Sequence, residues 1–140
     1  MELVANSIQN VDAGQNIVFT ETLVKSCKPC IVHREGAGIV TLRGLTNQCN
    51  ARFLVNFSGN IAIPTGGTAE EISLAIAIEG EPLQSTRMRV TPAAVDQYFN
   101  VSSQAYVDVP RGCCASVAVE NTAGQAINVQ NANLIVTREA

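Results

Sequence analysis

The sequence contains little charge, few aromatic side chains and no long apolar run. Of its 140 residues, 15% are charged and 4% are aromatic, and tryptophan is absent. Hydrophobic residues nevertheless make up 46%, which is too apolar for a disordered chain. The core must therefore rest on valine, isoleucine, leucine and alanine. The length fits one domain of ordinary size.

The scarcity of positive charge limits the partners that the chain can have. Lysine and arginine number 9 against 12 acidic residues, which gives a net charge of -3. Nucleic-acid binding needs an excess of basic residues, and so does a polybasic membrane anchor. Apolar stretches such as Leu74–Ile78 are far shorter than the roughly 20 residues that span a bilayer. We expect neither nucleic acid nor membrane as a partner.

The first 24 residues carry no basic region followed by an apolar one, so we expect no cleaved signal peptide. We expect the chain to be made in the cytoplasm.

Motifs of catalysis are also missing. The sequence has one histidine, His33, and it has no G-x-S-x-G, no H-E-x-x-H and no glycine-rich phosphate loop. A Ser-His-Asp catalyst would have to be built around His33. We therefore expect no enzyme activity, no catalytic residue and no cofactor.

Apolar and polar residues alternate with a period of two along nearly the whole chain, which is typical of half-buried strands. Turn residues separate the strands at a spacing of roughly 8–12 residues, as in an antiparallel sandwich or barrel. The one plausible helical turn is 91–94, so we expect less than about a tenth of the residues to be helical, against a usual third. The expected strands are 16–22, 38–43, 51–57, 59–64, 71–79, 87–91, 98–102, 105–109, 114–121, 127–129 and 134–137.

Two turns are expected inside this pattern. The segment Asn56–Asn60 contains Ser-Gly and predicts a hairpin turn, and Ser103-Gln104 is expected to separate another strand pair.

The strand 71–79 is the longest of the set, and we expect it to be central. One face carries Ile72, Leu74, Ile76 and Ile78, which should be buried. The other face carries Ser73, Ala75 and Ala77, whose small size allows close packing. A flat, mildly apolar surface of this kind often marks a subunit interface.

Residues 57–140 resemble a known family. The stretches that carry the resemblance are 57–68, the strand 72–78 with Gly80-Glu81-Pro82, Met88–Pro92, 96–102, Val109–Cys114 and Asn128–Leu134. Together they are similar to jelly-roll domains of the tumour-necrosis-factor and complement-like superfamily, in its bacterial and phage branch. Members of that branch include phage capsid decoration proteins and the C-terminal domains of collagen-like spore-surface proteins.

The resemblance implies an all-β, two-sheet jelly roll of about ten strands that assembles as a tight homotrimer. The chain carries no Gly-X-Y collagen stalk, which favours a free-standing capsid decoration (cement) or head-fibre protein of a bacteriophage. The virion surface is then the expected location. The alternative is a receptor- or carbohydrate-binding head on a bacterial or spore surface. Residues 1–15 are a possible arm that docks on a capsid protein and becomes ordered on binding, and residues 16–140 form the jelly roll.

The cysteines allow three kinds of chemistry. Cys27 and Cys30 form a C-x-x-C motif three residues before His33, and a fourth ligand from Cys49 or Cys113 would complete a zinc site. Thiol–disulfide exchange is the second alternative, although its usual helical setting is missing. Unmodified thiols or one or two disulfides are the plain interpretation, with at least one thiol left over because the count is five. We expect no metal, Cys114 pointing into the sandwich as a small apolar residue, and His33 solvated at a strand end.

Charged and aromatic residues have plain interpretations too. Arg87 and Arg89 share one strand face and are expected to pair with the glutamates of the neighbouring strand, Glu70, Glu71, Glu79 and Glu81. A calcium site is the alternative, but Asp-rich spacing is lacking. The rings of Tyr98, Phe99 and Tyr106 are either interface anchors or part of the core.

Overall fold

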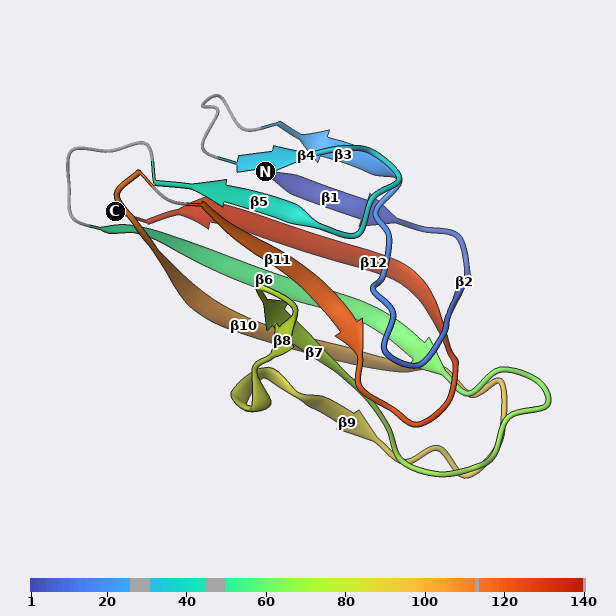
Figure 1. Cartoon of the computed structure of the whole chain (residues 1–140). Coiled ribbons are helices and arrows are strands. Elements are labelled where there is room, and N and C mark those ends of the chain that lie inside the picture. The colour runs from blue at the N-terminus through green and yellow to red at the C-terminus, as the bar shows by residue number, and fades with distance from the viewer. Residues whose placement is uncertain (26–30, 45–49, 113, 140) are drawn as a thin grey trace.

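The computed structural model describes residues 1–25, 31–44, 50–112 and 114–139, and these residues form two antiparallel sheets (Figure 1). No α-helix occurs in the described residues, so none is long enough to cross a membrane. The predicted all-β class is confirmed, with twelve strands where about ten were expected. In chain order they are β1 (Glu2–Ala5), β2 (Gln9–Val11), β3 (Glu21–Val24), β4 (Ile31–His33), β5 (Val40–Arg43), β6 (Asn50–Ala62), β7 (Ile72–Ile78), β8 (Glu81–Pro82), β9 (Met88–Val90), β10 (Phe99–Pro110), β11 (Cys114–Asn121) and β12 (Ile127–Arg138), with a 3₁₀ turn η1 (Gln84–Thr86) before β9.

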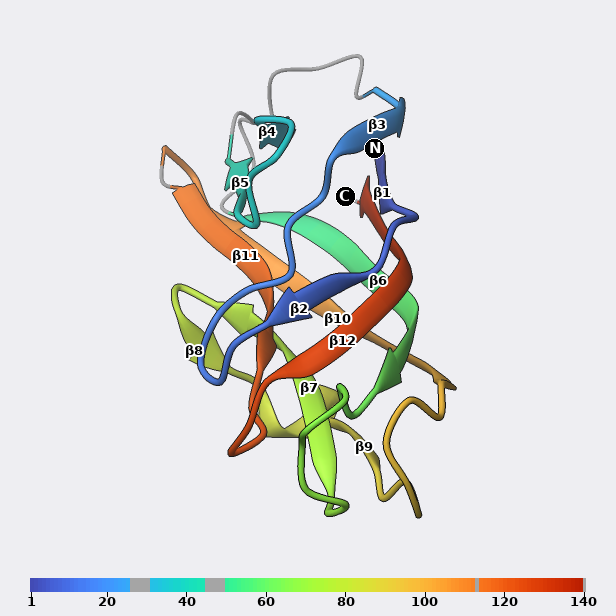
Figure 2. The same ribbon diagram turned by 90° about the vertical axis from the view of Figure 1, so that its right-hand side faces the viewer.

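The strand order within each sheet interleaves distant parts of the chain. The first sheet has the order β10-β6-β12-β1-β3. β2 also pairs with β12, at residues 127–129, before the part of β12 that pairs with β1. The second sheet has the order β4-β5-β11-β7-β8, and β9 pairs with β7. Both chain ends lie at the same end of the molecule, because β1 and β12 pair antiparallel (Figure 2).

The core lies between the two sheets and is almost entirely aliphatic. Period-two alternation turns every second side chain of each strand inward. The first sheet contributes a phenylalanine pair, Phe53 and Phe57, and Phe57 packs edge-on against Phe19 with 6.5 Å between ring centroids. The second sheet contributes Ile72, Leu74 and Ile76 from β7, all without solvent exposure as predicted, whereas Ile78 is half-buried.

The expected hairpin at 56–60 is wrong, because β6 runs without a break from Asn50 to Ala62. Gly59 lies inside this strand for reasons of space. A Cβ there would be 3.1 Å from Cζ of Phe57 and 3.5 Å from Cα of Ala132 on the neighbouring β12. The glycine therefore gives room to a core ring and to a close backbone approach.

The turn expected at Ser103-Gln104 is wrong as well, because β10 is one strand paired with β6 from Phe99 to Pro110. The irregularity lies in β12 instead. Its register against β6 shifts between Gln130 and Asn133, and Asn131 has a positive φ of 55°. This bulge joins the predicted strands 127–129 and 134–137 into one element.

The helical turn also lies elsewhere than predicted, at Gln84–Thr86 rather than at 91–94. It interrupts the strand that runs along the edge of β7, so that β8 and β9 pair with the two ends of β7. The Thr86 hydroxyl fills the gap. It accepts a hydrogen bond from the Ile76 amide at 3.0 Å and donates to the Leu83 carbonyl at 2.8 Å.

Residues 14–20 connect the two sheets and do not form the predicted strand 16–22. The Ile17 amide donates to the Val119 carbonyl of the second sheet, and the Thr20 amide donates to the Val4 carbonyl of the first. Ile17 and Phe19 lie between the sheets with no exposed surface. The segment thus closes one open side of the sandwich, and regular pairing begins at Glu21 in β3.

Residues 1–15, the expected docking arm, contribute β1 and β2 to the first sheet. Leu3, Val4, Ala5 and Val11 are buried, and the amino terminus donates to the Val136 carbonyl at 2.8 Å. The domain's own strands therefore hold this segment, and it is not an arm separate from the fold.

Candidate functional site

Four of the five cysteines, Cys27, Cys30, Cys49 and Cys113, lie outside the described residues, so their pairing and metal chemistry stay predictions. Cys114 begins β11 and is exposed. The expectation that it points inward is wrong, because Val117 and Val119 occupy the inward positions of β11 and Cys114 alternates with them. Among the described residues no three His, Cys, Asp or Glu side chains are grouped as metal ligands.

His33 was expected to be solvated at a strand end, but it is half-buried. Its Nε2 lies 2.9 Å from the Ala37 carbonyl, and its ring meets Phe19 edge-on with 6.4 Å between centroids. The Nδ1 atom is buried and has no hydrogen-bond partner in the described part of the chain. The ring therefore packs at the margin of the core.

The predicted pairing of Arg87 and Arg89 with the four glutamates is wrong for the described residues, which show no ion pair between them. Arg87 lies just before β9, at the end of η1, and its Nε donates to the Ser73 hydroxyl at 3.3 Å. The Glu79 carboxylate instead accepts from the Ser116 amide at 2.8 Å. Ser73 lies on β7 and Ser116 on β11, so Arg87 and Glu79 bond to uncharged groups of neighbouring strands and not to each other's charges.

The outer face of the first sheet carries an array of like side chains. The register of β10, β6 and β12 brings uncharged amide and hydroxyl residues into cross-strand rows. Asn100 donates to the Asn60 side chain at 3.1 Å, and Asn56 lies 3.4 Å from the Gln104 side-chain oxygen. We call this the amide-rich face, and it comprises Asn56, Ser58, Asn60, Asn100, Ser102, Gln104 and Asn133.

Apolar side chains lie on the same face. Tyr106 is 63% exposed and pairs with Leu54, and Ile135 is 41% exposed and pairs with Asn56. A shallow groove of about 280 Å³ runs beside Ile135 and Val24. Neither Tyr106 nor Phe99, which is 38% exposed, belongs to the core. The face therefore combines unpaired apolar surface with groups that both donate and accept hydrogen bonds.

One ion pair closes an end of the amide-rich face. The Arg52 guanidinium binds the Asp108 carboxylate through two hydrogen bonds of 2.8 and 3.1 Å, and it also lies 5.7 Å from the centre of the Tyr106 ring. The hydrogen bond from Arg52 holds the pKa of Asp108 below its ordinary value, and it raises the pKa of Arg52. The two charges thus satisfy each other at the rim.

The small residues of β7 do not form an open surface. Ser73, Ala75 and Ala77 are each about 1% exposed, so the expectation of a flat interface at this face is wrong. The Ser73 hydroxyl bonds to Thr122 at 2.6 Å and to Arg87, which cover it.

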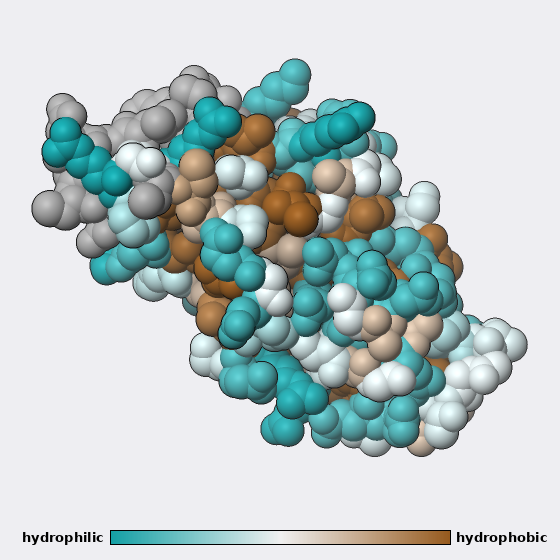
Figure 3. Space-filling view, in the orientation of Figure 1, coloured by the Kyte–Doolittle hydropathy of each residue, from teal (hydrophilic) through white to brown (hydrophobic). Residues whose placement is uncertain are grey.

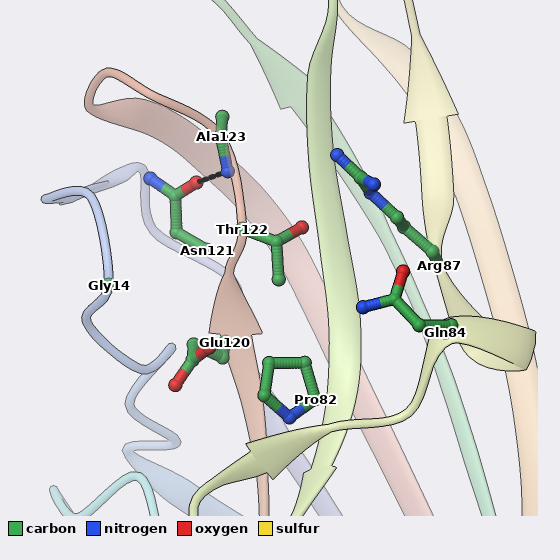
Figure 4. Close-up of a pocket in the computed structure, with 8 residues that line it drawn as sticks. All are labelled: Gly14, Pro82, Gln84, Arg87, Glu120, Asn121, Thr122 and Ala123. Carbon is green, nitrogen blue, oxygen red and sulfur yellow. Dashed lines mark hydrogen bonds between the residues drawn. The ribbon is translucent and has the colours of Figure 1, made fainter.

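A polar groove lies next to this covered face (Figure 4). It has a volume of about 370 Å³. The walls come from β8, η1, the end of β11 and the loop at Gly14. The lining residues are Gly14, Pro82, Gln84, Arg87, Glu120, Asn121, Thr122 and Ala123. Sequence reasoning missed this groove because its walls meet only through tertiary contacts.

The hydropathy of the rest of the surface differs from one region to another. In Figure 3 the surface over β8 and β9 is mainly hydrophilic, whereas apolar residues gather near β5 and the N-terminal segments. Exposed apolar residues of those segments include Ile8 at 54% and Val18 at 36%.

No protein-family model matches this chain, and no curated protein sequence does. Solved structures do match. The Eiger TNF of S. frugiperda has a TM-score of 0.68 at 16% identity, over 100% of this chain and 92% of that one. The globular domain of the zebrafish complement 1qA protein has a TM-score of 0.59 at 14% identity, over 96% and 93%. The C-terminal domain of the sugar-binding protein EclA reaches a TM-score of 0.43 at 17% identity, over 96% and 81%, and this weaker match carries no weight.

The chain therefore has the jelly-roll fold of C1q and TNF-like domains, as the resemblance predicted. At these identities the similarity establishes the fold and not the function. The bacterial and phage branch stays a prediction, because neither of the two closely superimposing structures is named as a bacterial or phage protein.

Proposed function

We propose that this chain is a non-enzymatic structural protein of a virus particle, a trimeric decoration or head-fibre protein on a bacteriophage capsid. The C1q and TNF-like fold across the whole chain is compatible with a binding or structural domain. The resemblance of residues 57–140 to the phage branch supports the finer role. The proposed assembly into a trimer rests on the chemistry of the amide-rich face.

The chemistry of that face suits contact between identical copies. A side-chain amide or hydroxyl both donates and accepts hydrogen bonds, so it can pair with the same group on another copy. A charged face would oppose its own copies by like-charge repulsion. Here the charges of Arg52 and Asp108 are paired at the rim, and the Glu2 carboxylate accepts from the Asn133 amide at 2.8 Å. The exposed Tyr106 and Ile135 and the half-buried Leu54 supply apolar surface to bury. We assign this face to the subunit contact, and threefold symmetry follows from the resemblance.

Mass photometry and analytical ultracentrifugation test the assembly. The wild-type protein should have three times the chain mass of 14.8 kDa. Ile135→Lys should dissociate the trimer, because it places a charge in the contact. Val32→Lys is the matched control, since Val32 is also 41% exposed but lies on β4 of the other sheet. A wild-type monomer at micromolar concentration, or an Ile135→Lys variant that stays trimeric, would overturn the assignment.

We further propose that the capsid contact uses the exposed part of the N-terminal segment. Ile8 lies between β1 and β2 and exposes 54% of its surface. The next residue, Gln9, is held against a second segment: its side chain donates to the Val18 carbonyl at 2.9 Å and accepts from the Val18 amide at 3.0 Å. Ile8 and the 36% exposed Val18 therefore lie on two segments that these contacts hold together, and their apolar surface is what we propose the capsid protein buries.

Immuno-electron microscopy of virus particles from the organism that encodes the chain tests the location. Antibodies against the purified protein should label the capsid surface. Label on cells or spores and not on particles would overturn the virion proposal. Particles assembled with an Ile8→Asp variant should lose most of the label while the variant remains a trimer. Full occupancy by that variant would exclude the Ile8 patch as the contact.

A further inference from the structure

The polar groove beside β7 has walls that are fixed before any ligand arrives. Asn121 is buried, and its side-chain amide donates to the carbonyls of Val11 and Gln125 at 3.0 and 2.9 Å. Its oxygen accepts from the Ala123 amide at 2.8 Å. One side chain therefore ties the turn after β11 to the N-terminal loop, so the groove is preorganised.

The opposite wall is held by the turn η1. Thr86 anchors this turn to β7, and the Arg87 Nε donates to the Ser73 hydroxyl. The bond through Nε leaves the two terminal nitrogens of the guanidinium without a partner in the described residues. Gln84 precedes them on the same wall, and its side-chain amide has no partner in that part of the chain either.

The acceptor in the groove comes from β11. Glu120 is half-buried, and its carboxylate has no partner among the residues that the structure describes. It does not form an ion pair with Arg87. Figure 4 shows the Pro82 ring between Glu120 on one side and Gln84 on the other. The groove thus offers an unpaired acceptor, unpaired donors and an apolar ring between them.

We propose that this groove binds a neutral saccharide. A sugar hydroxyl donates and accepts at once, so hydroxyls at one end of a saccharide can donate to Glu120 while those at its other end accept from Arg87 and Gln84. The C–H face of a sugar ring can pack on Pro82. A phosphate would be repelled by Glu120 and a cation by Arg87, which disfavours charged ligands. The volume of about 370 Å³ lies at the lower end of the range of about 300–1,000 Å³ for small-molecule sites, so it suits one or two sugar rings.

The groove is independent of the proposed assembly. Its residues belong to the second sheet and the loops beside it, whereas the amide-rich face belongs to the first sheet. A trimer formed through the amide-rich face would leave the groove open. Loss of sugar binding and loss of the trimer are therefore separate results.

Amide NMR spectra of the ¹⁵N-labelled full chain test the proposal. The probes are glucose, galactose, mannose and N-acetylglucosamine, with inorganic phosphate for comparison. At least one sugar should shift the signals of Gly14, Gln84 and Thr122, and it should leave those of Asn56 and Gln104 in place. No shift from any sugar, shifts confined to another surface, or stronger binding of phosphate would overturn the proposal.

Two variants separate a site from a chance contact. Glu120→Ala should raise the dissociation constant of the bound sugar about tenfold or more, because a hydrogen bond to a charged group is lost. Glu81→Ala is the matched control, since Glu81 lies on β8 and is exposed outside the groove. Spectra unchanged away from the groove establish that Glu120→Ala is folded. An equal dissociation constant in Glu120→Ala would exclude Glu120 from the site and overturn the assignment.

Discussion

The hydroxyl of Thr86 replaces a backbone group at the edge of β7. Between β8 and β9 no strand residue is opposite Ile76, whose amide would otherwise lack an acceptor. Thr86 supplies that acceptor at 3.0 Å and is itself about 1% exposed. A buried amide without an acceptor is costly, so this one side chain allows the edge strand to be interrupted.

Thr86→Val keeps the shape of the side chain and removes the hydroxyl. It should lower the free energy of unfolding by about 1–3 kcal/mol, because the Ile76 amide is then buried without a partner. Urea denaturation followed by circular dichroism measures the change. Ser85→Ala is the control in the same turn, and Ser85 is exposed, so its loss should stay below about 0.5 kcal/mol. Equal losses in both variants would contradict the role given to the Thr86 hydroxyl.

Asp108 provides a second test at the level of one residue. The hydrogen bond from Arg52 lowers the pKa of this carboxyl below its ordinary 3.8. A carboxyl with a lowered pKa favours the folded state above its ordinary pKa, and this contribution disappears as the pH falls through the lowered value. In Arg52→Met the Asp108 pKa should therefore move up toward 3.8. A carboxyl ¹³C NMR titration measures it, with Arg89→Met as control, and an unchanged midpoint in Arg52→Met would contradict the prediction.

Individual residues also show where sequence reasoning succeeded and failed. The alternation of β11 is sufficient to place Cys114 outside, because the apolar Val117 and Val119 take the other set of alternating positions and are buried. His33 differs, since its contact with Ala37 and Phe19 depends on a loop that period-two alternation does not describe. The groove at Glu120 and Arg87 depends on three separate segments, so no local pattern could have indicated it.

At the level of elements, the sequence predicted strands well and their ends poorly. Ser58-Gly59 looks like a turn because glycine weakens a strand. In the structure the bulge of β12 lies beside it, and the space for Phe57 explains the glycine. Assuming a break there also concealed the amide-rich face, because the alternation of Asn56, Ser58 and Asn60 continues through it.

A prediction at the level of one element concerns the burial of strand β7. Ile76 has no exposed surface and lies in the core between β11 and the β8–β9 edge. Ile76→Ala should lower the free energy of unfolding by about 2–5 kcal/mol through lost burial and the cavity left behind. Ile39→Ala makes the same change at a side chain that is 50% exposed, and its effect should be far smaller. A loss below about 0.5 kcal/mol at Ile76 would place that side chain outside the core.

For the whole molecule, alternation and turn spacing were enough to predict an all-β sandwich, and the resemblance added the jelly roll. The closure of the sandwich was not predictable in the same way. Residues 14–20 bond to both sheets one amide at a time, so they show the alternation of a strand without pairing as one. The N-terminal strands were missed because β1 and β2 are short and their partner, β12, is more than a hundred residues away.

The last prediction concerns deletion of residues 1–15. If they were a separate docking arm, their removal would leave the domain intact. In the structure β1 lies between β12 and β3, so deletion leaves an unpaired edge on β12 and removes the partner of β3.

The deletion also removes the buried side chains of Leu3, Val4 and Val11. Burial of each such side chain stabilises a fold by about 1.5–3 kcal/mol, and a domain has about 5–15 kcal/mol in total. We therefore expect the truncated chain to lose cooperative thermal unfolding, as measured by circular dichroism, whereas Ile8→Asp should keep it because Ile8 is exposed. A truncated chain that melts at the full-length midpoint would show that β1 and β2 are dispensable, and the arm would again be the better interpretation of this segment.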